Sequence, residues 1–358
     1  MDISDENTAQ EAISAEATYL QASWRKVAIS LLLLAVLIVV AVLAISLGAA
    51  SLGAFESFSA VLSWLLPMEE PSRLAQMVVL QLRLPRIIMA VMTGLSLGIA
   101  GAAMQGVLRN PLVSPYTLGL SSGAACGAAL AIVMGAEGGS YVIVLSAFSF
   151  SLLTMVIVYS ISRIKGTSVE TLILAGVAMG YLFSAIISSF KYVSGHEELR
   201  EIVFWLMGGL YTSRWENLTI LVPLVLVLTL AIMRYSWDLN ALSAGEEVAK
   251  SLGIDVGRVR VICLSLASVL TAAVISFTGI IGFIGLVSPH LCRLLVGSDH
   301  RYLIPASGLM GALVLLISDT ACRTAIQPTE IPVGIVTSFI GVPFFLYLLV
   351  RKKRRWWQ

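Results

Sequence analysis

Charged residues are scarce in this 358-residue sequence: they make up 12% of the chain, whereas hydrophobic residues make up 58%, and the mean hydropathy is +0.92. A water-soluble globule of this length could not bury so much apolar surface in one core. The scarcity of charge therefore excludes an ordinary soluble protein and predicts that the chain lies in a lipid bilayer.

Two motifs of ATP-driven and zinc-dependent catalysis are also missing. No Gly-Lys dipeptide occurs, so the chain cannot form the phosphate-binding P-loop of an ATPase, and HExxH is not present. The four cysteines lie in apolar runs without CxxC spacing, which favours packing roles over metal ligation or a disulfide. We expect no enzyme activity, no cofactor and no metal site, so another chain must supply the energy for any work.

Ionisable residues are nearly absent from the middle of the apolar runs. Asp319 and Arg293 fall near the ends of their runs, and no series of mid-span Asp, Glu, Lys or His exists. Carriers driven by protons or sodium ions usually bind the coupling ion with such groups. An ion-coupled secondary carrier is therefore the less favoured alternative.

The apolar runs predict an all-α membrane protein. A hydrocarbon core about 30 Å thick needs roughly 20 apolar residues per helix, and the sequence offers ten candidate spans. The eighth is the weakest, because it is short and contains His290 and Arg293. The expected spans are 27–47, 86–108, 112–134, 140–162, 169–190, 217–234, 260–282, 285–297, 303–322 and 331–350.

The basic residues predict the orientation. With ten spans both termini share a side, and the cluster RKKRR at 351–355 assigns that side to the cytoplasm by the positive-inside rule. Residues 1–24 contain acidic but no basic residues, unlike a signal peptide, and we expect a disordered cytoplasmic tail. Residues 25–358 would then form one multi-pass domain in the cell (cytoplasmic or inner) membrane.

The tetrad LVSP occurs at 112–115 and again at 286–289, a shift of 174 residues that also places Arg86 on Arg260. In both copies an Arg opens a span and the tetrad is expected to open the next. Five predicted crossings separate the copies, so the second would be inverted relative to the first, as in transporters whose working site lies at the repeat interface. The expected repeat halves are about 80–190 and 255–350; two unrelated spans that begin with proline are the alternative.

Glycines spaced four residues apart predict close helix packing. Gly119, Gly123 and Gly127 share one helix face, and the pairs Gly94/Gly98 and Gly176/Gly180 repeat the spacing. Small residues at this spacing let helix backbones approach each other in lipid. Packing within the subunit is the favoured interpretation, and a pathway lining or a subunit interface is the alternative.

Residues 236–260 form the longest polar stretch on the predicted cytoplasmic side. Within it, 239–253 predicts two short helices with a break at Gly245, acidic residues at the start of the second helix, and Gly253 after its last turn. Such a helical hairpin could dock another protein, although an ordinary amphipathic loop would show the same pattern.

Several motifs in one order resemble the permease subunits of type II ABC importers, which take up iron-siderophores, haem and cobalamin. The resemblance runs from about residue 80 to the C-terminus. Its motifs are LRLPR (82–86), MQGVLRNPLVSPYTLGLSSGA (104–124), LILAGVAMG (172–180), FWLMGGL (204–210), LNALSAGEEVAKSLG (239–253), GFIGLVSPHLCRLLVGSDHR (282–301), SDTACR (318–323) and EIPVGIVTSFIGVPFFLYLL (330–349).

The resemblance implies a homodimer of ten-helix subunits in the type II importer permease fold. Two cytoplasmic ABC ATPase subunits would drive it, and an extracytoplasmic substrate-binding protein would deliver the cargo; no nucleic acid is involved. It favours an iron chelate, siderophore or haem, as cargo, with cobalamin as the alternative.

The resemblance also assigns roles to residues. Arg83, Arg86 and Arg323 match arginines that pair with acidic residues of the binding protein. Ser168, Val169 and Glu170, with Gly176 and Gly180, lie where the gate and the pathway helix would be, although a carboxylate at position 170 departs from the small polar residues expected. The ATPase-coupling hairpin would use Leu239, Asn240, Leu242, Gly245, Glu246, Ala249, Leu252 and Gly253.

Overall fold

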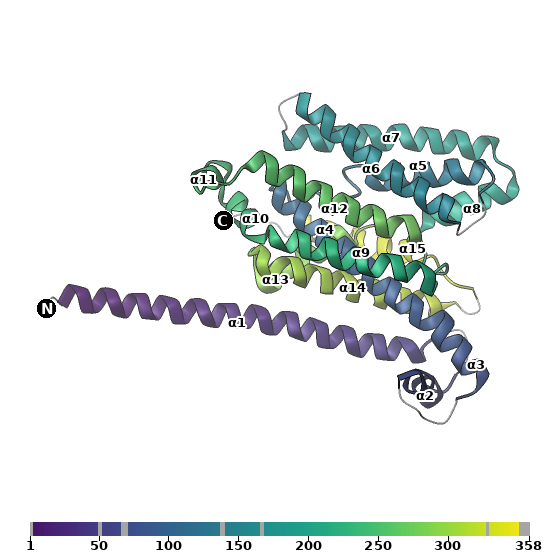
Figure 1. Cartoon of the computed structure of the whole chain (residues 1–358), viewed down its shortest axis with the longest axis horizontal. Coiled ribbons are helices and arrows are strands. Elements are labelled where there is room, and N and C mark those ends of the chain that lie inside the picture. Colours follow the sequence, from purple (N-terminus) through teal and green to yellow (C-terminus); the bar gives the residue numbers. More distant parts are fainter. Residues whose placement is uncertain are drawn as a thin grey trace.

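The computed structural model describes residues 3–48, 52–65, 71–136, 140–164, 168–326 and 329–350, and every regular element in these ranges is a helix. The basic cluster 351–355 lies outside the described residues. Most helices are packed side by side in one bundle, with α1 along one flank (Figure 1). The predicted all-α class is therefore confirmed.

The first helix, α1 (Ile3–Ser46), is longer than the apolar run that predicted it. Its stretch Leu20–Ser46 is long and apolar enough to cross a membrane. The acidic segment 1–24, expected to be disordered, is instead helical from Ile3 onward. The physical reason is its content of Ala, Glu and Gln, which are good helix formers, and its acidic residues near the positive end of the helix dipole.

Ten apolar helices correspond to the ten predicted spans. Seven of the described helices have the length and composition to cross a membrane, and three shorter ones, at Leu120–Val133, Ile284–Val296 and Val333–Tyr347, match the third, eighth and tenth predictions. The remaining spans are α4 (Leu84–Val107), α6 (Tyr141–Ile164), α7 (Val169–Val193), α9 (Trp215–Arg234), α12 (Val256–Thr278) and α14 (His300–Ala325).

The helices outside the predicted spans lie mainly near the start of the chain. The second helix, α2 (Ala54–Leu65), is followed by α3 (Arg73–Gln76) and η1 (Met77–Arg83), a π-helix that continues directly into α4. A further short helix, α8 (His196–Met207), follows α7 and ends at Gly208, which has a positive φ of 66°. None of these four was predicted from the apolar runs.

The two copies of the tetrad have different local structures. Pro289 lies inside α13 (Ile284–Val296), whereas Pro115 precedes α5 (Leu120–Val133), in a loop that starts after α4 and is only partly buried. The expectation that both tetrads open a helix is therefore wrong for the first copy. There Pro111 disfavours helix at Asn110, whose side chain instead accepts a hydrogen bond from the Leu112 amide in a turn.

The inverted relation of the two copies is visible in the arrangement of their first helices. Figure 1 shows that α4 begins beside α3 and α12 begins beside α11 (Glu246–Ser251), at opposite ends of the bundle. The two helices pack against each other and run in opposite directions. Both are followed by a non-helical segment and then by one of the short helices, α5 or α13.

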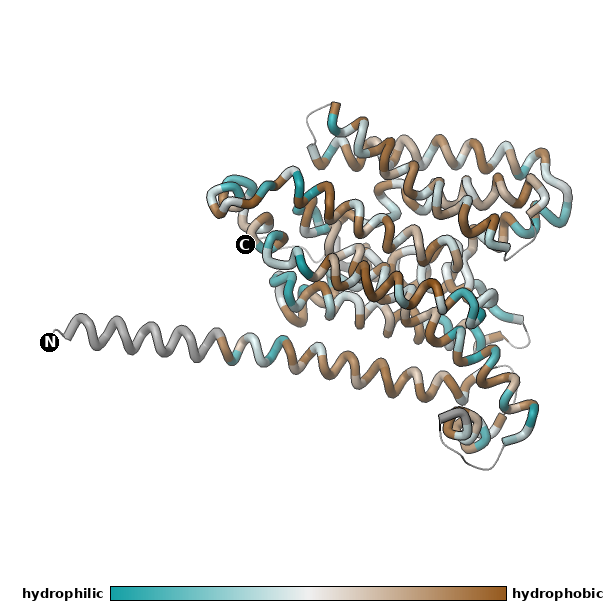
Figure 2. The backbone as a smooth tube through the Cα atoms, in the orientation of Figure 1, coloured by the Kyte–Doolittle hydropathy of each residue, from teal (hydrophilic) through white to brown (hydrophobic). Residues whose placement is uncertain are grey.

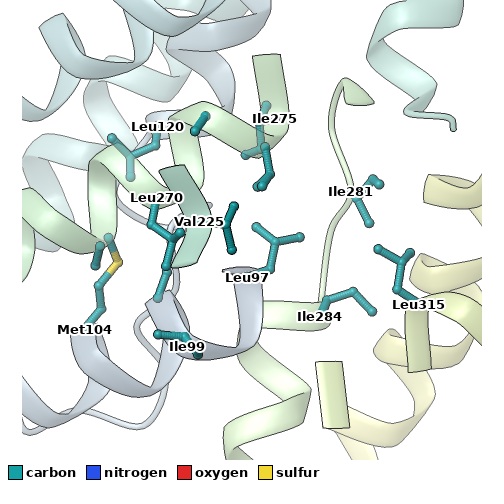
Figure 3. Close-up of a cluster of buried hydrophobic side chains, with 14 of the residues drawn as sticks. Leu97, Ile99, Met104, Leu120, Val225, Leu270, Ile275, Ile281, Ile284 and Leu315 are labelled. Carbon is teal, nitrogen blue, oxygen red and sulfur yellow. The ribbon is translucent and has the colours of Figure 1, made fainter. Parts of the chain in front are cut away.

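The core is built where these helices cross. Leu97 and Met104 of α4, Leu270 and Ile275 of α12 and Leu315 of α14 belong to one buried hydrophobic cluster (Figure 3). Apolar residues also cover most of the length of the spans, and hydrophilic residues gather toward the two ends of the bundle (Figure 2).

Glycines set the distance between α4 and α14. A Cβ atom at Gly98 would lie 2.1 Å from the Ser307 carbonyl oxygen, and one at Gly94 would lie 2.3 Å from that of Gly311. The predicted small-residue face is thus confirmed, and its partner lies within the same subunit. Gly123 and Gly127 likewise pack closely against α6.

Candidate functional sites along the bundle

A cavity of about 780 Å³ lies where the two repeat copies meet. Tyr116 and Thr117, from the loop before α5, form one side, and Gly282 and Phe283, from the segment before α13, form another. The other walls come from α8 and from α15 (Val333–Val350), which contributes Ser338 among others. Interrupted helices at corresponding positions of two halves are the sequence feature that marks transporter binding sites.

The lining of this cavity is apolar with a few hydroxyl groups. None of its described lining residues carries a charge, and the polar side chains are Ser114, Tyr116, Thr117 and Ser338. Phe283 adopts the left-handed conformation, with φ 67°, which is uncommon for a residue other than glycine. The cavity can therefore accommodate a bulky molecule without binding it through ion pairs.

The three arginines that the resemblance singled out meet at one end of the bundle, which we call the arginine end. Asp319 lies between two of them: it is 2.9 Å from Arg86 and 3.0 Å from Arg323, and it is fully buried. Arg86 also contacts Glu330 at 2.6 Å, and Glu330 is 39% exposed. A cavity of about 480 Å³ is lined by Arg83, Arg86, Arg323 and Glu330.

Two of these arginines also cap α1. Arg83 donates to the Ile45 carbonyl at 2.7 Å and Arg323 donates to the Leu47 carbonyl at 3.0 Å. The last carbonyls of a helix have no partner within the helix and lie at the negative end of its dipole, so guanidinium groups stabilise them. Arg83 and Arg323 are only 4% and 5% exposed, and the Arg86 side chain is 12% exposed, so Glu330, at 39%, is the most accessible charge of the cluster.

The opposite end of the bundle, which we call the hairpin end, carries the two predicted short helices. α10 (Ser236–Ala244) and α11 (Glu246–Ser251) are separated at Gly245, whose φ is 140°, and Gly253 has a φ of 80°. The predicted helical hairpin is therefore confirmed.

The hairpin has an inward and an outward side. Leu239, Leu242 and Ala249 are fully buried, whereas Val248 and Leu252 are 45% and 67% exposed. The outward side therefore presents apolar side chains that the subunit itself does not cover.

Polar contacts of Glu246 and Asn240 attach the hairpin to the bundle. Arg260, at the start of α12, contacts Glu246 at 2.5 Å. Asn240 donates to the Asp299 carboxylate at 2.8 Å and accepts from the His300 amide at 2.7 Å. Sequence reasoning included Asn240 and Glu246 but missed Arg260, Asp299 and His300, because their contacts join segments far apart in the chain.

The predicted gate residues surround the start of α7. Ser168 caps this helix by accepting from the Thr171 amide at 3.2 Å, Val169 is the first helical residue, and Glu170 is exposed. Gly176 packs against the loop before α5, where a Cβ atom would lie 2.6 Å from the Thr117 carbonyl oxygen. Gly180 has only Ser122 nearby, at 3.6 Å. Gly176 thus holds α7 against the loop that lines the central cavity.

Comparisons with known proteins agree with this architecture. The model of the FecCD transport family matches residues 13–351. This chain belongs to the FecCD transport family. FecCD relatives include the cobalamin import system permease protein BtuC of Halobacterium salinarum, 45% identical over 280 residues that cover 77% of this chain and 74% of the relative. The hemin transport system permease protein HmuU of Yersinia pestis is 39% identical over 280 residues, covering 77% and 84% of the two chains.

A solved structure shares the complete fold of this FecCD protein. It is an inward-facing conformation of a metal-chelate type ABC transporter, with a TM-score of 0.80 and 36% sequence identity, and the match covers 90% of this chain and 99% of that one. The FecCD chain is therefore a membrane-embedded permease of the ABC transporter type.

Proposed function

We propose that this chain is the permease subunit of an ATP-driven importer that moves a metal chelate, with an iron-siderophore or haem as the favoured cargo. The observation that carries the proposal is the uncharged cavity at the junction of two inverted repeats, since such a cavity suits a large ligand that must be released again. The relatives that import cobalamin and hemin support this cargo class. Cobalamin is the alternative cargo.

The hairpin end would be cytoplasmic and would bind the ATPase. Its exposed Val248 and Leu252 offer an apolar surface beside the acidic start of α11, and the chain has no ATP-binding motif of its own. ATP-driven closure of the ATPase pair would push the hairpins of two permease copies and open the path at alternate ends. The start of α7, with Ser168, Val169 and Glu170, would form the gate on this side.

The arginine end would face a substrate-binding protein outside the membrane. Arg86 is the least buried arginine of the cluster, with 12% of its side chain exposed, and Arg83 and Arg323 would hold the surrounding surface in place. Acidic side chains of a docked protein would pair with Arg86 in competition with Glu330. Both chain termini would then be cytoplasmic, in agreement with the positive-inside rule.

The decisive experiment is transport by the reconstituted complex. Proteoliposomes with the permease, an ABC ATPase partner and a substrate-binding protein should accumulate the cargo only with ATP in the compartment that the hairpin faces. Ferric siderophores, haem and cobalamin would be compared. Accumulation without ATP would instead identify a secondary carrier, and the absence of uptake for all three would reject the cargo class.

A variant of Leu252 tests whether the hairpin is the surface that binds the ATPase. Leu252→Asp should weaken binding of the ATPase subunit, because it places a charge within an apolar contact. Leu74→Asp is the matched control, since Leu74 is 61% exposed but lies in α3 at the arginine end. Equal ATPase binding by the two variants would exclude the hairpin as the docking surface.

Variants in the cavity test the path. Ser338→Trp should narrow the central cavity and obstruct uptake, whereas Ser338→Ala, which removes only the hydroxyl group, should leave uptake largely intact. Normal uptake by the Trp variant would place the path elsewhere.

A further inference from the structure

The hairpin is joined to the first turn of α14 through one asparagine side chain. Asn240 of α10 uses both ends of its amide: Nδ2 donates to Asp299 Oδ1 at 2.8 Å, and Oδ1 accepts from the His300 backbone amide at 2.7 Å. The His300 ring nitrogen Nδ1 is 3.0 Å from the same Asn240 oxygen. Asp299 is itself the N-cap of α14 and accepts from the Arg301 amide.

A second α10 residue holds the same turn. The Arg301 guanidinium lies over the Trp237 ring at 4.1 Å and binds both carboxylate oxygens of Asp299. Trp237 and Asn240 are three residues apart, so they share one face of α10. Burial would raise the pKa of Asp299, but the hydrogen bonds from Arg301 and Asn240 outweigh it and lower the pKa to about 2. Asp299 is therefore ionised at neutral pH.

The start of α14 is also wedged against α4. His300 is fully buried, and its Nε2 would lie 2.4 Å from a Cβ atom placed on Gly106 at the end of α4. The α14 helix therefore cannot shift along its axis without moving both α4 and the hairpin.

The far end of α14 reaches the arginine cluster. Asp319 and Arg323 lie about 30 Å and 36 Å along the helix from its start, at 1.5 Å per residue. Between the two ends the α14 backbone touches α4 at Gly94 and Gly98, and this close contact leaves little freedom to bend or slide. One continuous helix, which contains Pro305 near its start, thus connects the joint at the hairpin with the ion pairs beside Arg86.

We propose that Asn240 and Asp299 form the joint that transmits movement of the hairpin to α14, and through α14 to the Arg86–Asp319–Arg323 cluster at the opposite end of the subunit. The inference rests on the proposed function. It assigns to Asn240 and Asp299 positioning roles: these residues contact neither cargo nor ATP, and they link two docking surfaces. ATP binding to the ATPase at the hairpin end would thereby change the surface at the arginine end that the substrate-binding protein contacts.

A fluorescent label at the far end of α14 can report this transmission. Ile326 follows α14 and is 59% exposed, so Ile326→Cys provides a reactive thiol. The four native cysteines are buried and should stay unlabelled, which the parent chain without the new cysteine verifies. The permease and its ATPase partner are assembled in lipid nanodiscs, and the fluorescence change on adding ATP and vanadate is divided by the amount of bound ATPase.

Three changes at the joint separate transmission from general stability. Asn240→Asp places a carboxylate against that of Asp299 and should reduce the fluorescence change at least about five-fold, the lower end of typical coupling between sites. The double variant Asn240→Asp/Asp299→Asn exchanges donor and acceptor and should restore most of the change. Asn110→Asp is the matched control, because Asn110 acts only as an acceptor, for the Leu112 amide, which a carboxylate replaces.

The outcomes distinguish the joint from the proposed function. A full response in Asn240→Asp would overturn the joint, as would a double variant that melts at the wild-type temperature and still fails to respond. If the wild-type chain binds no ATPase at all, the proposed function fails and the joint fails with it. Transmission through the joint is supported if the double variant regains the fluorescence change that Asn240→Asp loses. A general loss of stability would not be repaired by exchanging the two side chains.

Discussion

The contact between α4 and α14 makes a quantitative prediction for Gly98→Ala. The new Cβ atom would lie 2.1 Å from the Ser307 carbonyl oxygen, whereas real Cβ atoms stay at least 3.0 Å from such neighbours. The obstacle is backbone, so no side chain can rotate away, and α14 must retreat by about 1 Å. Overpacking of this kind costs about 1–3 kcal/mol.

Gly180→Ala makes the same chemical change without this clash. Gly180 lies inside α7, and its nearest neighbour would be 3.6 Å from the new Cβ atom. Replacing Gly by Ala inside a helix stabilises it by up to about 1 kcal/mol, and this gain is common to both variants. The difference between the two variants therefore isolates the steric cost, about 1–3 kcal/mol.

The assay is thermal unfolding of the purified permease in detergent, followed by the exposure of its buried cysteines to a thiol-reactive dye. Gly98→Ala should unfold several degrees below Gly180→Ala, and Gly180→Ala should equal or exceed the wild type. Equal midpoints for the two variants would refute the close approach of α4 and α14. The close packing of α14 against α4, on which transmission from the proposed joint depends, would then have no support.

Three further predictions concern charged and capping residues. Asp319→Asn should cost up to about 3–5 kcal/mol, because it leaves buried arginines without their carboxylate, whereas Glu330→Gln, at an exposed position, should cost less than about 1 kcal/mol; unfolding midpoints compare them. The wild type should unfold with a higher free energy than Asp299→Asn, by an amount that is constant above pH 5. This difference should disappear as the pH falls from about 4 toward the folded pKa of Asp299, about 2. A difference between the two proteins that increases as the pH is lowered would contradict this. Ser168→Ala should remove about 1 kcal/mol of helix-capping energy, which amide hydrogen exchange in the first turn of α7 would detect; unchanged exchange would exclude the cap.

The sequence predicted best what depends on local composition. The apolar runs placed all ten spans because each must satisfy its backbone within lipid. Gly245, Gly253 and the adjacent acidic residues located the hairpin, because positive φ angles and the helix dipole act over a few residues.

What the sequence could not supply were contacts between distant segments. Arg86 and Asp319 are 233 residues apart, and nothing near either one identifies its partner. For the same reason the sequence could not show that Arg83 and Arg323 donate to the carbonyls at the end of α1 within the subunit. The two LVSP tetrads have the same sequence but different local structures, because Pro111 precedes the first tetrad and disfavours a helix there.

The cap on α1 constrains how the protein is made. Arg323 donates to a carbonyl of Leu47, which precedes it by 276 residues. At roughly 5–20 residues per second, a ribosome reaches that arginine on the order of 15–60 s after the end of α1 has been translated. Arg83, only 38 residues after Ile45, can cap the Ile45 carbonyl much sooner, but until Arg323 is made the Leu47 carbonyl must be hydrated by water or bonded by lipid headgroups. The first membrane helix to be translated therefore receives one of its two caps early and the other only near the end of synthesis.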